Sequence, residues 1–204
     1  MTKFGIGKLD SKDLAVITKY IEEEFAGAKA VKRLSYPHGQ DASRIIDVIR
    51  GEKFPKPEIT SWCTIGLSNY SWESQDFPDR NELVGALKSS DHDYGMVLAT
   101  VAHALIDLGT FPRPGMVMQE AVKMCELGEL SEKMPHAMFV FPHTWGEKLS
   151  GTRIAASNVW MLQVVPIFDD EYRFIQKYSF EQFEEILVAK GVSFVNPGRQ
   201  CCVV

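Results

Sequence analysis

Apolar residues recur at helical spacing in several parts of the chain, beginning near its N-terminus. Between residues 11 and 26 they form one stripe that ends at Phe25, which predicts an amphipathic helix. Asp10 or Ser11 can cap this helix, and Gly27 can end it.

The same spacing predicts three further helices, over residues 91–108, 169–177 and 179–190. Asp91 stands where it can cap the first of them, and Ser179 with Gln182 forms the capping-box pattern S-x-x-Q at the start of the last. Residues 116–127 are ambiguous between helix and strand, and they fit a short strand followed by a helical turn.

Short segments rich in β-branched and aromatic residues predict strands. They cover residues 29–36, 44–50, 59–67, 81–88, 135–141, 159–168 and 192–195. Strands come in a block and helices follow, with one late strand, which is an α+β pattern more than an alternating βαβ pattern. We therefore expect a mixed, largely antiparallel β-sheet flanked by helices. The 204 residues are expected to form a single domain with a core from about residue 10 to 200.

The overall charge is mildly acidic, with a formal net value of −5. Nucleic-acid binders carry a basic face that displaces counterions from phosphates, and the densest basic cluster here is only Lys29, Lys32 and Arg33. We expect no direct binding of nucleic acid, whereas a basic protein partner would be attracted.

The chain begins MTKFGIGKLDSKD, which has no apolar signal region. It also has no apolar run of about 18 residues, the minimum for a membrane-spanning helix. These features predict a cytoplasmic protein without a membrane span, with secretion by a route that needs no such signal as the alternative.

The histidines lack the spacing that zinc sites use; they are His38, His92, His103, His136 and His143. We interpret His103, inside an apolar helix, as a hydrogen-bonded core residue. No metal and no cofactor are expected.

No catalytic constellation is evident either. The chain has no G-x-S-x-G elbow, and Cys63 lies in the middle of a predicted strand, where a buried inert thiol is expected. Asp169, Asp170 and Glu171 are consecutive and read as the acidic first turn of a helix, although a contact surface remains an alternative. No catalytic residue and no small-molecule ligand are expected.

The polar segment of residues 70–80 is a candidate contact surface, because it places aromatic residues among acids. Aromatic side chains anchor interfaces and acids steer basic partners. We therefore predict that Trp72, Glu73, Asp76 and Asp79 bind a protein partner. The alternative is that the aromatic side chains fold onto the core while the acids are merely solvated.

A second candidate contact is Trp145, in the loop FPHTWGEKL. The same two alternatives apply to it: an anchor for a partner, or a side chain folded onto the core.

Four short motifs occur in a fixed order along the chain. TSWCTIGLS at residues 60–68 is followed by Asn81-Glu82-Leu83, and LQVVPIFDDEYRFIQKYSFEQFEEIL at residues 162–187 is followed by FVNPGR at residues 194–199. In this order they resemble the bacterial suppressor-of-fused (SUFU) domain. There, T-x-G-L-S, an E-L strand start, P-I-x-x-x-E and D/N-P-x-R recur.

The resemblance implies a SUFU-like fold and a function in protein binding without a cofactor. Bacterial members are often encoded beside polymorphic toxins and act as immunity proteins, some of them against nucleases, and the animal member binds a transcription factor. Our first hypothesis is therefore an immunity protein or antitoxin that binds a cognate toxin. The alternatives are a regulatory scaffold that sequesters a non-toxin protein and a hydrolase with an unrecognised site.

Overall fold

The computed structural model describes residues 9–70, 79–88, 93–154 and 157–203. The strands are β1 (Ala30–Pro37), β2 (Ile45–Glu52), β3 (Ile59–Ile65), β4 (Arg80–Lys88), β5 (Val117–Met118), β6 (His136–Val140), β7 (Gly151–Arg153) and β8 (Asn158–Ile167). The helices are α1 (Ser11–Glu24), α2 (Tyr94–Leu108), α3 (Glu129–Lys133), α4 (Asp169–Lys177) and α5 (Phe180–Lys190).

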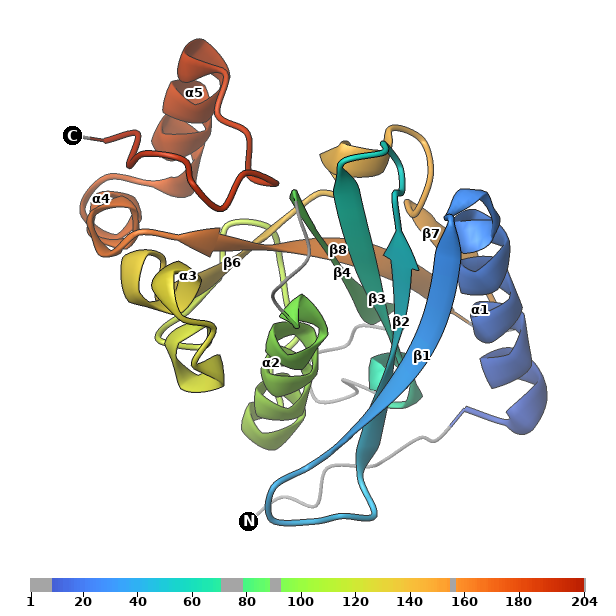
Figure 1. The fold of residues 1–204 in the computed structure, drawn as a ribbon. Helices are drawn as coiled ribbons and strands as arrows, with labels where there is room; N and C mark the ends of the chain where they lie inside the picture. Colours follow the sequence, from blue (N-terminus) through green and yellow to red (C-terminus); the bar gives the residue numbers. More distant parts are fainter. Residues whose placement is uncertain (1–8, 71–78, 89–92, 155–156, 204) are drawn as a thin grey trace.

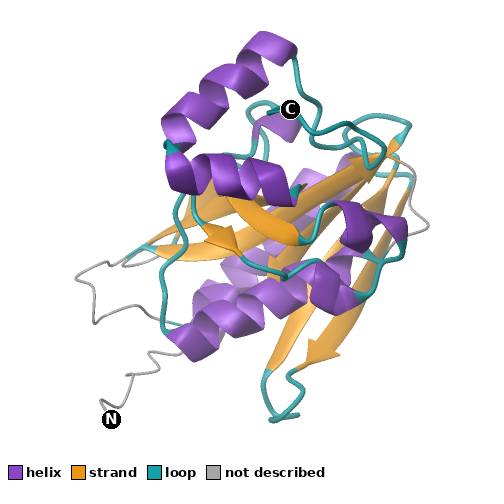
Figure 2. Ribbon diagram, turned by 90° about the vertical axis from the view of Figure 1, so that its left-hand side faces the viewer, coloured by secondary structure: helices purple, strands orange, loops and turns teal. Residues whose placement is uncertain are grey.

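All of these strands belong to one sheet with the order β1-β2-β3-β4-β8-β6-β5, and β7 pairs with β8 beside that path (Figure 1). The pairs are antiparallel except for β4 with β8, which run parallel. Helices lie on both sides of the sheet (Figure 2). The predicted fold class, a mixed and largely antiparallel sheet flanked by helices, is confirmed.

The two faces of the sheet are covered by different helices because successive strand residues point in opposite directions. Trp62 of β3 belongs to the apolar cluster that includes α2, whereas the next residue, Cys63, belongs to the cluster that includes α1. A third cluster joins α4 and α5 to the far halves of β6 and β8. The sheet is therefore buried on both faces around β3, β4 and β8.

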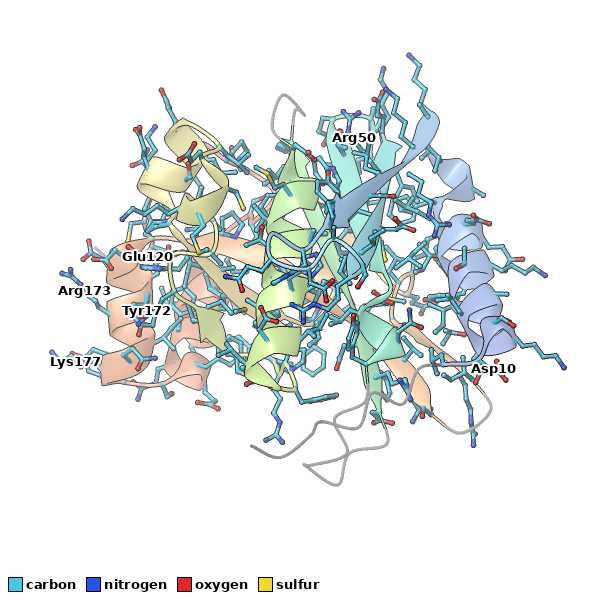
Figure 3. The ribbon with its side chains drawn as sticks, turned by 90° about the horizontal axis from the view of Figure 1, so that it is seen from below. Asp10, Arg50, Glu120, Tyr172, Arg173 and Lys177 are labelled. Atoms are coloured by element: carbon cyan, nitrogen blue, oxygen red, sulfur yellow. The ribbon has the colours of Figure 1, made fainter. Side chains whose placement is uncertain are left out.

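Two predicted helix caps are confirmed. The Asp10 side chain accepts hydrogen bonds from the backbone N–H groups of Lys12 and Asp13 at the start of α1 (Figure 3), and Ser179 accepts one from Gln182 at the start of α5. These side chains satisfy backbone donors that a first helical turn leaves unpaired.

Helix α2 begins later than the sequence pattern predicts, at Tyr94, with Asp93 at the N-cap. The carboxylate of Asp93 accepts the hydroxyl hydrogen bond of Tyr36 at 2.8 Å, which ties α2 to β1. The predicted cap, Asp91, lies outside the described residues.

The predicted strand over residues 192–195 is wrong. This segment makes one backbone hydrogen bond to the sheet, from Lys88 N–H to the carbonyl oxygen of Val195. Val195 packs into the α1 cluster, whereas Val192 and Phe194 pack against the cluster of α4 and α5. The segment bridges two clusters, so its apolar residues follow packing and not strand pairing.

Residues 116–127 do form a short strand and a helical turn, which are β5 and a 3-10 turn at Lys123–Cys125. Helix α3 and strand β7 were not expected from the sequence. Both are short, and a pattern of so few residues carries little periodic signal.

Glu82 of β4 is fully buried, and the turn after β3 supplies its hydrogen-bond donors. Its carboxylate accepts from the Thr64 hydroxyl at 2.6 Å, from Gly66 N–H at 2.8 Å and from both the N–H and the hydroxyl of Ser68. Burial raises the pKa of Glu82, and these hydrogen bonds oppose the shift. The T-x-G-L-S and E-L motifs are therefore two halves of one buried carboxylate site.

A second fully buried carboxylate, Glu171 of α4, forms a two-pronged ion pair with Arg199. The two guanidinium-to-carboxylate distances are 2.5 and 2.6 Å. Arg199 also donates to the carbonyl oxygen of Pro166, and Cys202 N–H donates to Glu171. The P-I-x-x-x-E and N-P-x-R motifs thus meet in space, and their contact fixes the C-terminal segment to α4 and the end of β8.

Replacing Arg199 with Met should lower the free energy of unfolding by about 3–5 kcal/mol, because Glu171 would stay buried without its partner. The double variant Glu171→Leu/Arg199→Met should be more stable than the single variant, since it leaves no unpaired charge. Urea denaturation measures both values. A double variant that is no more stable than Arg199→Met would contradict this explanation.

The ion pair should also make the free energy of unfolding depend on pH. Burial alone would raise the pKa of Glu171, but the hydrogen bonds and charge of Arg199 hold it below the ordinary value of 4.5. The folded state therefore favours the ionised carboxylate. Its contribution is present above the ordinary pKa and lost as the pH falls through the folded-state value. The free energy of unfolding of the wild type should therefore fall relative to that of the double variant on acidification from about pH 7 to about pH 3; a constant difference would contradict the assignment.

Candidate functional site

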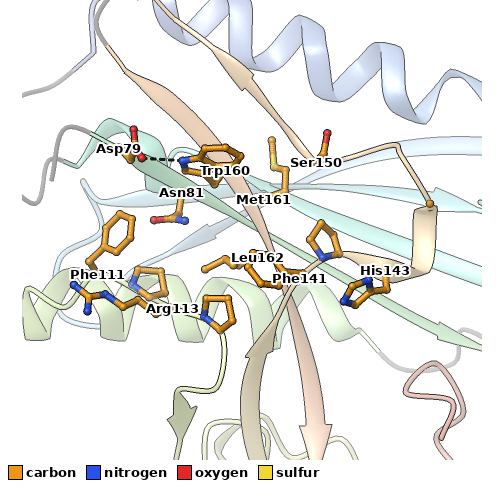
Figure 4. A pocket seen from close by; sticks show the side chains of 14 residues that line it. Asp79, Asn81, Phe111, Arg113, Phe141, His143, Ser150, Trp160, Met161 and Leu162 are labelled. Atoms are coloured by element: carbon orange, nitrogen blue, oxygen red, sulfur yellow. Dashed lines mark hydrogen bonds between the residues drawn. The ribbon is translucent and has the colours of Figure 1, made fainter. Parts of the chain in front are cut away.

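A cleft of about 470 Å³ lies beside the apolar cluster of α2, at the middle of β8 (Figure 4). Its walls come from β4, β8, the segment after α2 and the segment after β6. The lining residues are Asp79, Asn81, Phe111, Pro112, Arg113, Pro114, Phe141, Pro142, His143, Gly146, Ser150, Trp160, Met161 and Leu162. Cavities of this size and apolar character are where proteins commonly bind ligands or partner side chains.

The cleft forms where one edge of β8 loses its neighbour. β6 ends with Val140 opposite Gln163, and β7 begins with Gly151 opposite Trp160. Within the described part of the chain, no residue pairs with Met161 and Leu162 on this edge. Residues 141–150 leave the sheet here and form one wall of the cleft.

Glycine is required where the chain returns to β8. Gly151 has φ +140°, and a Cβ atom there would lie 2.6 Å from the carbonyl oxygen of Val159. A side chain at this position would push β7 away from β8, so Gly151 sets where the gap between β6 and β7 ends.

Two aromatic side chains stand at the cleft with large exposed areas: Phe141 is 58% exposed and Trp160 is 48% exposed. Asp79 holds Trp160 in place, since its carboxylate accepts the indole N–H hydrogen bond at 2.9 Å (Figure 4). The same carboxylate accepts a second bond from the Asn158 amide at 3.0 Å. The position of the Trp160 ring is therefore set by contacts within the chain.

Asn81 supplies the buried polar group of the cleft. It is 2% exposed, and its side-chain oxygen accepts no hydrogen bond from the described residues. Burying an unpaired amide oxygen costs about 1–3 kcal/mol. This cost contrasts with the neighbouring Glu82, whose two oxygens are fully bonded.

Of the residues predicted to contact a partner, the structure places Asp79 at the cleft. Its two carboxylate oxygens are already bonded within the chain, which gives it a positioning role for Trp160. Trp72, Glu73 and Asp76 lie outside the described residues, and contact of these four residues with a partner stays a prediction.

Trp145 lies in the core and not on the surface. It is 5% exposed, packs in the α1 cluster and donates its indole N–H to the Ser61 hydroxyl at 2.9 Å. Its side chain is therefore not available as an exposed anchor, and the alternative interpretation, a loop tryptophan folded onto the core, describes it.

Sequence reasoning missed Phe141, Trp160 and Asn81 as site residues. All three lie in or next to segments that read as buried strands. They meet at the gap between β6 and β7, and a gap in strand pairing leaves no mark in a hydrophobic pattern.

The residues considered for catalysis are buried or hydrogen-bonded in ways that give them structural roles. Cys63 is fully buried, and burial raises the pKa of its thiol. His103 is 8% exposed, and its Nε2 atom lies 3.0 Å from the carbonyl oxygen of Tyr36, which confirms a hydrogen-bonded core histidine. The acidic triplet 169–171 begins α4 as predicted, and its last member, Glu171, forms the ion pair with Arg199.

Among the described residues, no group of three or more His, Cys, Asp or Glu side chains is placed to hold a metal ion. Within the same part of the chain, no helix has the length and apolar character needed to cross a membrane.

Comparison with known proteins identifies similar sequences and folds. The family model described as Suppressor of fused protein (SUFU) matches residues 42–200. Immunity protein YqcF of Bacillus subtilis (strain 168) is 29% identical over 160 residues, which are 78% of this chain and 82% of that protein.

Two solved structures share the fold. A SUFU homolog from Neisseria gonorrhoeae superposes with a TM-score of 0.68 at 14% identity, covering 95% of this chain and 98% of that one. A chain of the Sufu–Fu complex superposes with a TM-score of 0.66, also at 14% identity, covering 94% and 92%.

The placement of Trp145 predicts a stability effect. Trp145→Ala should lower the free energy of unfolding by about 3–5 kcal/mol, as for other large core side chains. Thermal or urea unfolding measures this. A variant as stable as the wild type would show that Trp145 contributes nothing to the core.

The bond from Trp160 to Asp79 predicts a spectroscopic effect. In Asp79→Ala the indole N–H of Trp160 loses its acceptor, so its NMR resonance should shift and its exchange with water should accelerate. Asp79→Asn is the matched control, because its amide oxygen can still accept the bond. Equal indole spectra for wild type and Asp79→Ala would contradict the assigned contact.

Proposed function

Because the chain belongs to the suppressor of fused (SUFU) family, we propose that it is an immunity protein that neutralises a cognate toxin by binding it directly. The observation that carries this proposal is the 29% identity to a relative named as an immunity protein, which extends over most of both chains. The cleft beside Trp160 offers a place where such a partner can bind, with exposed aromatic side chains around an apolar hollow.

The mechanism would be occlusion. A bound immunity protein covers the toxin's active site or its substrate groove, and it needs no chemistry of its own. The net charge of −5 suits a basic partner such as a nuclease, because opposite charges accelerate association. On this proposal the chain is not an enzyme and requires no cofactor.

The proposed site of action is the cytoplasm. All four cysteines are free thiols, which suits a reducing compartment. A cytoplasmic immunity protein would protect the cell that produces the toxin.

A second candidate is a regulatory scaffold that sequesters a protein other than a toxin. The structural similarity to a chain of the Sufu–Fu complex favours it, although that similarity is one of fold. Both candidates are binding proteins, and they differ in whether the partner kills cells.

Co-expression tests the immunity function. Cells that produce the toxin encoded beside this chain should resume growth when the chain is also expressed. The purified chain should also co-elute with a catalytically inactive form of the toxin. Equal killing with and without the chain would refute the immunity function. Co-elution with a harmless neighbouring protein instead would favour the scaffold.

A further inference from the structure

We infer that the cleft beside Trp160 receives a large apolar side chain from a loop of the protein partner, and that this loop donates a hydrogen bond to the side-chain oxygen of Asn81. The inference rests on the proposed function as a binding protein. It adds the place of contact and the chemistry of the group that enters.

The polar groups of the cleft determine what kind of group can enter. Asn81 lines the hollow, and its side-chain oxygen is buried and lacks a donor among the described residues. An occupant that donates an N–H or O–H would remove the cost of that unpaired oxygen. A carboxylate or phosphate has no donor to offer to this oxygen.

The apolar walls of the cleft indicate that the rest of the entering group is apolar. The sides of the cleft include the side chains of Phe111, Leu162 and Trp160. A polar group buried against them would lose its hydrogen bonds to water, whereas an apolar group has none to lose. The volume of about 470 Å³ accommodates a large aliphatic or aromatic side chain together with the backbone that carries it. A backbone N–H beside such a side chain is a donor of the kind that Asn81 lacks.

A macromolecule fits this surface better than a free small molecule. Phe141 and Trp160 are 58% and 48% exposed, so their apolar area continues beyond the hollow. A ligand confined to the cleft would leave that area in water, whereas a protein surface would cover it. Interface energy concentrates where an anchor side chain enters such a pocket and neighbouring contacts exclude water.

The gap in the sheet favours a loop over an added strand. Only Met161 and Leu162 lack a neighbour on this edge of β8 in the described chain, and β6 and β7 occupy the edge on either side. An extended strand that pairs along an edge needs a longer free stretch. A loop can insert one side chain without displacing either strand.

The cleft is also rigid before binding, which lowers the entropic cost of association. The bond from Asp79 fixes the Trp160 ring. The site is therefore built into the sheet.

Calorimetry with purified, catalytically inactive toxin tests the inference. Trp160→Ala and Phe141→Ala should each weaken binding, by about 30-fold or more for an anchor position. The matched controls are Tyr178→Ala and Met124→Ala, which remove large side chains that are 53% and 71% exposed elsewhere. They should bind within about threefold of the wild type.

Asn81→Leu separates a role in binding from a role in folding, because the two roles predict opposite effects on thermal stability. It should weaken binding about tenfold, because the partner's donor loses its acceptor. Its thermal stability should be unchanged or higher, because the free protein no longer buries an unpaired oxygen. A benzophenone amino acid at position 141 should cross-link to the toxin, at a loop that carries a large apolar residue.

The outcomes separate this inference from the proposed function. Tight binding by the wild type together with control-like affinity of Trp160→Ala, Phe141→Ala and Asn81→Leu would overturn the inference and leave the immunity function standing. No binding by the wild type would overturn both. Self-association of the chain alone that Trp160→Ala abolishes would assign the cleft to a second copy, which also overturns the inference.

Discussion

A carboxylate can be buried in a protein only if the chain supplies its hydrogen-bond donors, and this constraint organises the molecule. Glu82 and Glu171 are both fully buried. The first draws the turn after β3 onto β4, and the second draws Arg199 and the C-terminal segment onto α4. The first contact adds to the pairing of β3 with β4, and the second joins α4 to a C-terminal segment outside the sheet.

The cleft lies in the same sheet, but it contains a buried polar atom that has no hydrogen-bond partner among the described residues. In β4 the unsatisfied Asn81 directly precedes the satisfied Glu82 in sequence. The neighbouring strand β8 presents Trp160 beside Asn81, where the pairing of β7 and β6 is interrupted. A buried polar atom without a hydrogen-bond partner lowers stability, and such a cost is expected where a protein keeps a group ready for a partner.

The sequence predicts much of this architecture because its local signals agree with the fold. Asp10 and Ser179 cap helices where the pattern places them. The family motifs identify the fold, although their physical meaning, two buried carboxylates and their donors, emerges only in three dimensions. The site was harder to predict. Trp145 looks like a loop residue and is core, whereas Trp160 looks like core and is half exposed, because burial depends on neighbours that lie far away in sequence.

We propose that this protein acts by binding a protein partner through the cleft side of β8. Hydrogen–deuterium exchange of the chain with and without the inactive toxin can test this binding mode. New protection is expected in residues 79–83, 111–114, 141–150 and 158–162, with α1 and α5 unchanged. Protection confined to α1 or α5, with none around the cleft, would contradict it.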